Sequence, residues 1–113
     1  MKNTQIILII ICLFSIDTTV LGQTDKISFE VAGNCNMCKE RIESALDIKG
    51  IKFANWTAET QTCNVTFNSN KVTKKEIHQI IAKVGHDTQV CRAKDEDYNG
   101  LHQCCQYKRI YSE

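Results

Sequence analysis

The chain has 113 residues, with 14 basic and 13 acidic side chains and a formal net charge of +1. This length suits a single domain, and the even charge balance provides neither a basic surface for nucleic acid nor a polybasic cluster for anionic membranes. We therefore expect no nucleic-acid partner, and the seven cysteines are the first candidates for functional residues.

The first 22 residues have the composition of a secretory signal peptide. Lys2 precedes an unbroken apolar run over residues 6–14, and small residues close to Gly22 offer a cleavage site. A bilayer-spanning helix needs about 20 apolar residues, so the short run predicts cleavage and no stable membrane insertion afterwards. We expect an exported protein, with a bacterial periplasm as its compartment. The predicted organisation is a signal peptide at 1–22, a folded domain at 23–93 and a cysteine-containing tail at 94–113.

The first half of the predicted domain contains three strands and one helix. Apolar and polar residues alternate over residues 26–31, which is typical of a half-buried strand. From Cys38 the apolar residues recur with helical spacing until Gly50 ends the helix. Residues 51–56 and 63–67 then predict two strands joined by a polar turn, and hence a hairpin.

The second half repeats the helix-then-strand order. Thr73 and Glu76 have the spacing of a capping box, which marks a helix start. Residues 77–84 place their apolar side chains in one stripe, and Gly85 is expected to end the helix. Residues 88–92 then predict a fourth strand.

The element order βαββαβ predicts an α+β, ferredoxin-like sandwich. Right-handed crossovers would place both helices on one face of a four-stranded antiparallel sheet. The apolar residues expected in its core are Ile27, Phe29, Val31, Ile42, Leu46, Ile51, Val65, Phe67, Ile77, Ile80, Ile81 and Val84.

Cys35 and Cys38 stand where the first strand passes into the first helix. The amide groups at a helix start favour thiolate over thiol, and thiolates select soft ions such as Cu(I). The spacing alone also fits a thiol–disulfide oxidoreductase, or a secreted structural domain held by three disulfides. Against the oxidoreductase, the chain has no proline, whereas a thioredoxin-type site needs a cis-proline facing its cysteines.

In element order, loop position and cysteine spacing, residues 26–92 resemble the heavy-metal-associated domain. This family includes copper chaperones, amino-terminal modules of copper-transporting ATPases and mercuric-ion periplasmic binding proteins. The resemblance implies that Cys35 and Cys38 are the metal ligands, that the ion is passed to a docked partner by thiolate exchange, and that the protein is not an enzyme. We expect Cu(I) as the cargo, with Hg(II) or Zn(II) as alternatives, and a metal-transporting ATPase or another transporter as the partner.

The loop departs from the family pattern Gly-Met-x-Cys-x-x-Cys, because Asn34 stands between Gly33 and Cys35 and the loop methionine is missing. Met37 either fills part of the resulting gap or lies on the surface. His86 occupies the loop where some cyanobacterium-type copper chaperones carry a histidine that looks like a third ligand. It is therefore either a third ligand or a solvated loop residue.

The tail is similar to a Tyr-x-x-Leu-x-x-Cys-Cys-x-Tyr segment that ends other exported bacterial proteins with this domain, matched here by residues 98–107. We hypothesise that the tail folds back and adds Cys104, Cys105 or His102 to the same metal or to a second one. Oxidation of the two adjacent cysteines is the alternative. Cys63, in contrast, alternates with core residues and is expected to be structural.

Overall fold

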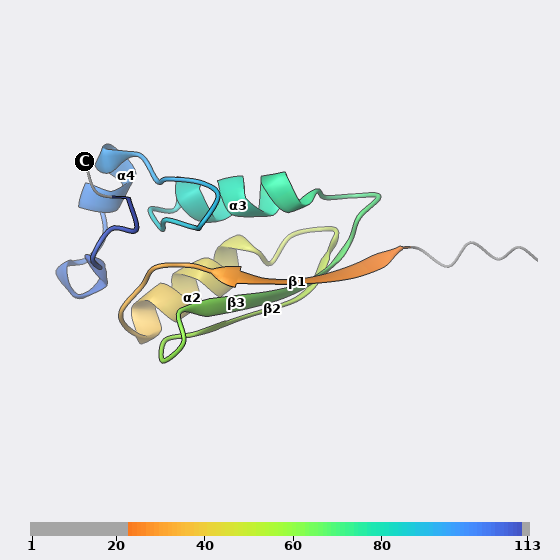
Figure 1. Cartoon of the computed structure of the whole chain (residues 1–113), viewed down its shortest axis with the longest axis horizontal. Coiled ribbons are helices and arrows are strands. Elements are labelled where there is room, and N and C mark those ends of the chain that lie inside the picture. Colours follow the sequence, from red (N-terminus) through yellow and green to blue (C-terminus); the bar gives the residue numbers. More distant parts are fainter. Residues whose placement is uncertain (1–22, 112–113) are drawn as a thin grey trace, which may run out of the picture.

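The computed structural model describes residues 23–111, so the predicted signal peptide lies outside the described residues. Two main helices pack against an antiparallel sheet, and the tail lies at the end of the molecule where the first of them begins (Figure 1). A helix with the length and sustained hydrophobicity needed to cross a bilayer is absent from residues 23–111. The elements are β1 (Thr24–Glu30), α2 (Asn36–Ala45), β2 (Ile51–Thr57), β3 (Thr62–Asn68), α3 (Lys74–Lys83), α4 (Asp95–Asn99) and the 3-10 turn η1 (Gln103–Cys105).

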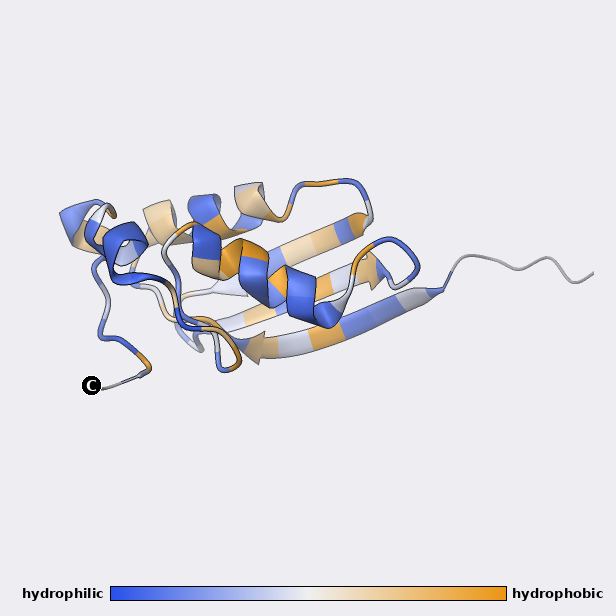
Figure 2. Ribbon diagram, turned by 90° about the horizontal axis from the view of Figure 1, so that it is seen from above, coloured by the Kyte–Doolittle hydropathy of each residue, from blue (hydrophilic) through white to orange (hydrophobic). Residues whose placement is uncertain are grey.

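The sheet has the order β1-β3-β2, with both outer strands antiparallel to β3. Apolar residues are interspersed with polar ones along the strands (Figure 2), and the buried apolar ones share a single core with side chains from α2 and α3. In the register, Phe29 of β1 and Trp56 of β2 lie opposite Cys63 of β3. The predicted α+β arrangement with an antiparallel sheet is therefore confirmed.

The local signals for α3 are also confirmed. Thr73 is the N-cap, and its Oγ1 accepts a hydrogen bond from the backbone N–H of Glu76 at 3.1 Å. At the other end Gly85 has a φ of +99°, a left-handed conformation that glycine adopts without steric cost. The N–H of Gly85 bonds to Ala82 O, and that of His86 bonds to Ile81 O, which is the Schellman pattern. This geometry turns His86 inward immediately after the helix.

The predicted fourth strand is wrong: among the described residues the sheet has three strands, and residues 88–92 form only one bridge, between Thr88 and Val31. Side-chain oxygens explain the difference, because they take backbone N–H groups that a strand would offer to its neighbour. Thr88 Oγ1 accepts from the N–H of Val90 at 3.1 Å and of Cys91 at 2.9 Å. The chain therefore turns away from β1 instead of extending it.

The same threonine orders a buried histidine. Thr88 Oγ1 lies 2.7 Å from His78 Nδ1, and because this oxygen already accepts two N–H groups, its own proton points to the imidazole. His78 is buried and packs against Phe29 with ring centroids 4.3 Å apart. Burial lowers its pKa below the ordinary 6.5, so folding disfavours protonation of this side chain.

We expect the metal-free protein to lose stability as the pH falls below 6.5. A histidine whose pKa is lowered by folding binds fewer protons in the folded than in the unfolded state, so stability is retained above pH 6.5 and lost below it. The slope contributed by His78 can reach about 1.4 kcal/mol per pH unit. Chemical denaturation between pH 7.5 and 5.5 should show a smaller decrease for H78Q than for the wild type. The exposed His102 provides the control, and an H102Q variant with the same reduced decrease would contradict the assignment.

The core matches the sequence prediction for its central members. Eight of the twelve predicted core residues are buried. Ile27, Ile51 and Ile80 are half-buried and pack against the core, while Val84 is half-buried outside it. Trp56 is a further core residue, not among those predicted, and it is fully buried. Its indole Nε1 donates to Val31 O at 2.9 Å, so this side chain ties β2 to the end of β1, directly before the cysteine loop.

Candidate metal centre

Two of the candidate ligands are placed by the start of α2. Cys35 is the N-cap residue with extended backbone, and its carbonyl accepts hydrogen bonds from the N–H groups of Cys38 at 3.0 Å and Lys39 at 3.1 Å. Cys38 therefore lies in the first turn of the helix, rather than before it, and is buried. This turn brings the Sγ atoms of Cys35 and Cys38 to 3.6 Å from each other.

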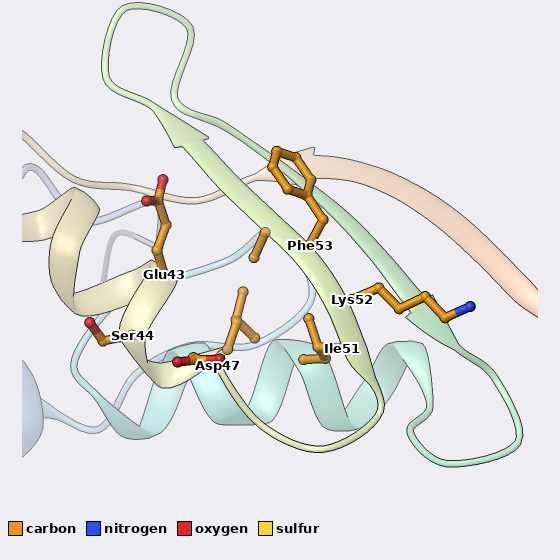
Figure 3. Close-up of a pocket in the computed structure, with 8 residues that line it drawn as sticks. Glu43, Ser44, Asp47, Ile51, Lys52 and Phe53 are labelled. Atoms are coloured by element: carbon orange, nitrogen blue, oxygen red, sulfur yellow. The ribbon is translucent and has the colours of Figure 1, made fainter.

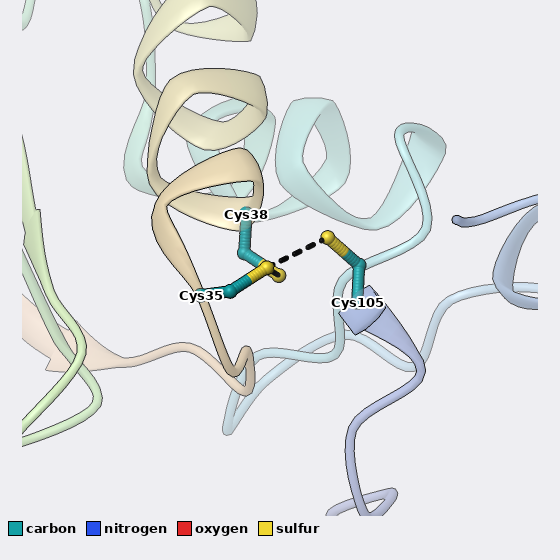
Figure 4. Close-up of side chains that lie close together, drawn as sticks. All are labelled: Cys35, Cys38 and Cys105. Carbon is teal, nitrogen blue, oxygen red and sulfur yellow. Dashed lines mark hydrogen bonds between the residues drawn. The ribbon is translucent and has the colours of Figure 1, made fainter. Parts of the chain in front are cut away.

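The tail brings further sulfur atoms to the same place from the far end of the chain. Cys105 Sγ lies 3.2 Å from Cys35 Sγ, and Cys104 Sγ lies 3.6 Å from it. The sulfurs of Cys35, Cys38 and Cys105 all lie within 4.8 Å of one another (Figure 4). With metal–sulfur bonds of about 2.3 Å, three sulfurs around one ion stand about 4.0 Å apart, so only a small rearrangement would be needed to hold one.

The environment of the cluster favours one thiolate. Burial would raise the pKa of Cys35, but hydrogen bonds from Cys105, the Cys38 amide, Cys104 and the Cys38 thiol together lower it to about 6. Burial raises the pKa of Cys38 to about 12 and also raises that of Cys105. Hydrogen bonding to Cys35 raises the pKa of Cys104. The metal-free cluster therefore carries its negative charge on Cys35, to which the thiols of Cys38 and Cys105 can donate.

Arg41, on α2, faces this cluster. Its guanidinium counteracts the rise in the pKa of Cys105 that burial causes. Arg41 Nη1 is buried and has no hydrogen-bond partner among the described residues. A buried cationic donor next to several thiols favours their ionised form, which is the form that binds metal.

The tail is held in place by an ion pair on its other side. Asp87 is fully buried, and its carboxylate accepts hydrogen bonds from Arg109 Nε at 2.7 Å and Arg109 Nη2 at 2.9 Å. The N–H groups of Ala93 and Ile110 also donate to it, at 2.8 and 3.2 Å. Four hydrogen bonds to one buried carboxylate fix both ends of the tail against the domain.

Two tyrosines of the tail reinforce this attachment. The Tyr107 hydroxyl donates to Gly85 O at 2.6 Å and accepts from the Asp87 N–H at 2.7 Å, and burial raises its pKa. The Tyr98 hydroxyl donates to the carbonyl of Tyr107 at 2.6 Å. Leu101 packs closely on Gly85: a Cβ atom added to Gly85 would lie only 2.9 Å from the Cδ2 atom of Leu101. The tyrosines and the leucine of residues 98–107 therefore hold Cys104 and Cys105 against the domain.

His86 is not brought into the sulfur cluster. It lies outside the group of side chains whose ligand atoms are within 4.8 Å of one another, and it is fully buried rather than solvated. Its Nδ1–H donates to Ala32 O at 2.8 Å, so Nε2 carries the lone pair, and no described residue bonds to it. Burial lowers the pKa of His86. The ring stacks on Tyr107 with centroids 5.4 Å apart, and a role as metal ligand stays a prediction.

Other singled-out residues lie away from the cluster or at its edge. Cys63 is buried in β3, where it was expected to be structural, while His102 is exposed. Met37 is 41% exposed, and its Sδ lies 3.5 Å from Cys104 Sγ. The depression drawn in Figure 3 lies between α2 and β2, and no cysteine lines it.

Sequence reasoning missed Arg41, Asp87 and Arg109 as residues that shape the site. None belongs to a local motif, because each acts through a contact distant in sequence. A signal was present only for Asp87, which directly follows the singled-out pair Gly85-His86.

The chain matches the model of the heavy-metal-associated domain over residues 28–87. Among solved structures it is similar to the CopZ metallochaperone, with 29% identity, 57% of this chain and 98% of that chain covered, and a TM-score of 0.55. It is also similar to the N-terminal domain of a potential copper-translocating P-type ATPase from Bacillus subtilis in the Cu(I)-loaded state, at 25% identity, 65% and 94% coverage and a TM-score of 0.57.

Oxidised MerP from Ralstonia metallidurans CH34 has the same fold, with 23% identity, 59% and 96% coverage and a TM-score of 0.56. A comparison with curated proteins gives no match. The family match ends at Asp87, so the tail that carries Cys104 and Cys105 lies beyond it. The family match nevertheless covers both strand–helix units and the cysteine loop. The chain therefore belongs to the heavy-metal-associated domain family.

Proposed function

We propose that this protein binds a soft metal ion through the thiolates of Cys35, Cys38 and Cys105, and that this ion is Cu(I). The observation that carries the proposal is the approach of these three sulfurs to within 4.8 Å of one another. Two come from one helix start and the third from a tail 70 positions away from Cys35. A structural role alone does not require a thiolate at this point, whereas a soft cation does.

Copper is favoured over the other candidate metals by the ligand set. Three sulfurs with no oxygen or coordinating imidazole suit Cu(I), while Zn(II) prefers four ligands in a tetrahedron. Hg(II) is also thiophilic and is the principal competitor. The copper proteins among the structural relatives support the same choice.

The proposed role is the carriage or sequestration of the ion, without catalysis. A metal-transporting ATPase or another transporter is the proposed partner, since the Bacillus subtilis domain belongs to such an ATPase. We further propose export to a bacterial periplasm after removal of residues 1–22, with residues 23–93 as the metal-binding domain and residues 94–113 as its tail. In that compartment the cluster must be kept reduced or metal-loaded, because adjacent thiols otherwise oxidise.

Anaerobic titration of the reduced protein with Cu(I), Hg(II) and Zn(II), in competition with a chromophoric chelator, tests this function. Replacing Cys35 or Cys38 with serine should weaken Cu(I) binding by more than about 100-fold, since loss of an outer-shell partner alone costs 10–100-fold. Cys91 lies outside the cluster, and C91S should bind as the wild type does. Uptake of no thiophilic ion, or unchanged uptake by the C35S/C38S double variant, would refute the proposal.

Disulfide-exchange assays on the same samples address the oxidoreductase alternative. The low pKa of Cys35 makes it an able nucleophile, so metal-free protein should react with small disulfides. Turnover of a protein disulfide that copper does not inhibit would favour the enzyme.

A further inference from the structure

The metal centre contains more sulfur atoms than one Cu(I) ion takes. Beyond the group formed by Cys35, Cys38 and Cys105, Cys104 Sγ lies 3.6 Å from Cys35 Sγ and 3.5 Å from Met37 Sδ. Cys104 is not part of the set of sulfurs that lie within 4.8 Å of one another. A single tetrahedral site made of all four thiolates therefore does not describe this arrangement.

Around Cys35 the sulfurs fall into an inner and an outer group, and Cys104 Sγ links the two, because it lies close to both Cys35 Sγ and Met37 Sδ. The inner group contains the buried Cys38 and Cys105, and the outer group contains Cys104 and Met37, both exposed. A thiolate sulfur has more than one lone pair, so Cys35 can bridge two soft ions. We propose that the protein binds a second Cu(I) ion, held by Cys35, Cys104 and Met37 on the solvent side of the first. This inference rests on the proposed function, because the first ion is the one described there.

Met37 gives the outer group its chemical character. A thioether is a soft, neutral ligand that suits Cu(I). The side chain belongs to the first turn of α2 and is 41% exposed, with its sulfur directed at a thiol. Packing in the core therefore does not account for its position, whereas a place beside Cys104 does.

The charge balance also favours a second ion. Four thiolates around one Cu(I) carry three net negative charges, and a second Cu(I) reduces this number to two. Arg41, whose Nη1 is buried and without a hydrogen-bond partner among the described residues, lies on the Cys105 side of the cluster. The amino end of α2 adds a further partial positive charge. Each thiol that binds releases its proton to solvent, and no atom changes oxidation state.

Native mass spectrometry during anaerobic Cu(I) titration of the reduced full chain tests the second site. The wild-type monomer should take up two Cu(I) ions, the second more weakly, and X-ray absorption of the two-copper form should show copper–copper scattering. The C104S and M37L variants should each take up only one Cu(I) ion. C91S, which leaves all five cluster sulfurs in place, should take up two.

The outcomes distinguish a failure of the second copper site from a failure of the proposed function. A wild-type monomer that saturates at one Cu(I) overturns the second site and leaves the proposed function standing. Two Cu(I) ions in C104S and M37L as well as in the wild type also overturn it, because the second ion then has other ligands. A wild type that takes up no copper refutes both proposals.

Discussion

Replacing Asp87 with alanine is expected to release the tail and to lower the free energy of unfolding by about 3 kcal/mol. The carboxylate is fully buried and accepts four hydrogen bonds, two of them from Arg109. Breaking a buried ion pair costs about 3–5 kcal/mol, and the lower end applies because the Arg109 side chain is 16% exposed. Chemical denaturation measures the stability, and hydrogen exchange of residues 94–111 measures the release.

Asp95 provides the matched control, because its carboxylate also contacts Arg109, at 3.3 Å, but its side chain is 60% exposed. Exposed ion pairs contribute at most about 1 kcal/mol, so D95A should keep the tail protected. In D87A the affinity for Cu(I) should also fall, since Cys105 is no longer held beside Cys35. Should D87A fold too poorly, R109M tests the same pair. Full protection of the tail amides in both variants would disprove the role assigned to Asp87.

A Trp56→Ala variant is expected to lose about 3–5 kcal/mol of stability, a large share of the about 5–15 kcal/mol available to a domain. The indole is fully buried and bonds to Val31 O. It also lies directly under the cysteine loop, where a Cβ added to Gly33 would be 2.8 Å from the indole Cζ2 atom. The cavity would therefore form beneath the cysteine loop.

Phe53 lies on the same strand and is 57% exposed, so F53A should change the stability by no more than about 0.5 kcal/mol. Denaturation of both variants measures the difference. W56F, which keeps most of the ring volume and loses the N–H donor, separates packing from the hydrogen bond. Equal losses in W56A and F53A would mean that the indole does not support the loop.

The elements that local physical signals specify were predictable from the sequence. Alternation predicted β1 and β3, the Thr73 cap predicted the start of α3, and Gly85 predicted its end, since each signal depends only on residues close in sequence. The helix that carries Cys38 begins earlier than its apolar spacing indicates, at Asn36. The first residues of a helix are often polar, so the hydrophobic pattern does not reveal them.

Contacts between distant residues were not predictable. Residues 88–92 read as a strand, and only the fold shows that Thr88 Oγ1 takes the N–H groups of Val90 and Cys91. The pairing of Asp87 with Arg109 joins positions 22 apart, and no periodicity marks it. The convergence of Cys105 on Cys35 was a hypothesis drawn from the tail's similarity to other proteins, and its geometry required the three-dimensional structure.

The cysteines of the cluster are far apart in sequence although their sulfurs lie together, and this has a thermodynamic consequence. An ion bound by both Cys35 and Cys105 cross-links residues 70 positions apart and, like a disulfide, restricts the conformations open to the unfolded chain. Binding to the folded state alone stabilises it according to the logarithm of free ligand concentration. The melting temperature of this protein would thus follow the supply of its cargo, and metal starvation would leave a molecule that unfolds, and is degraded, more readily.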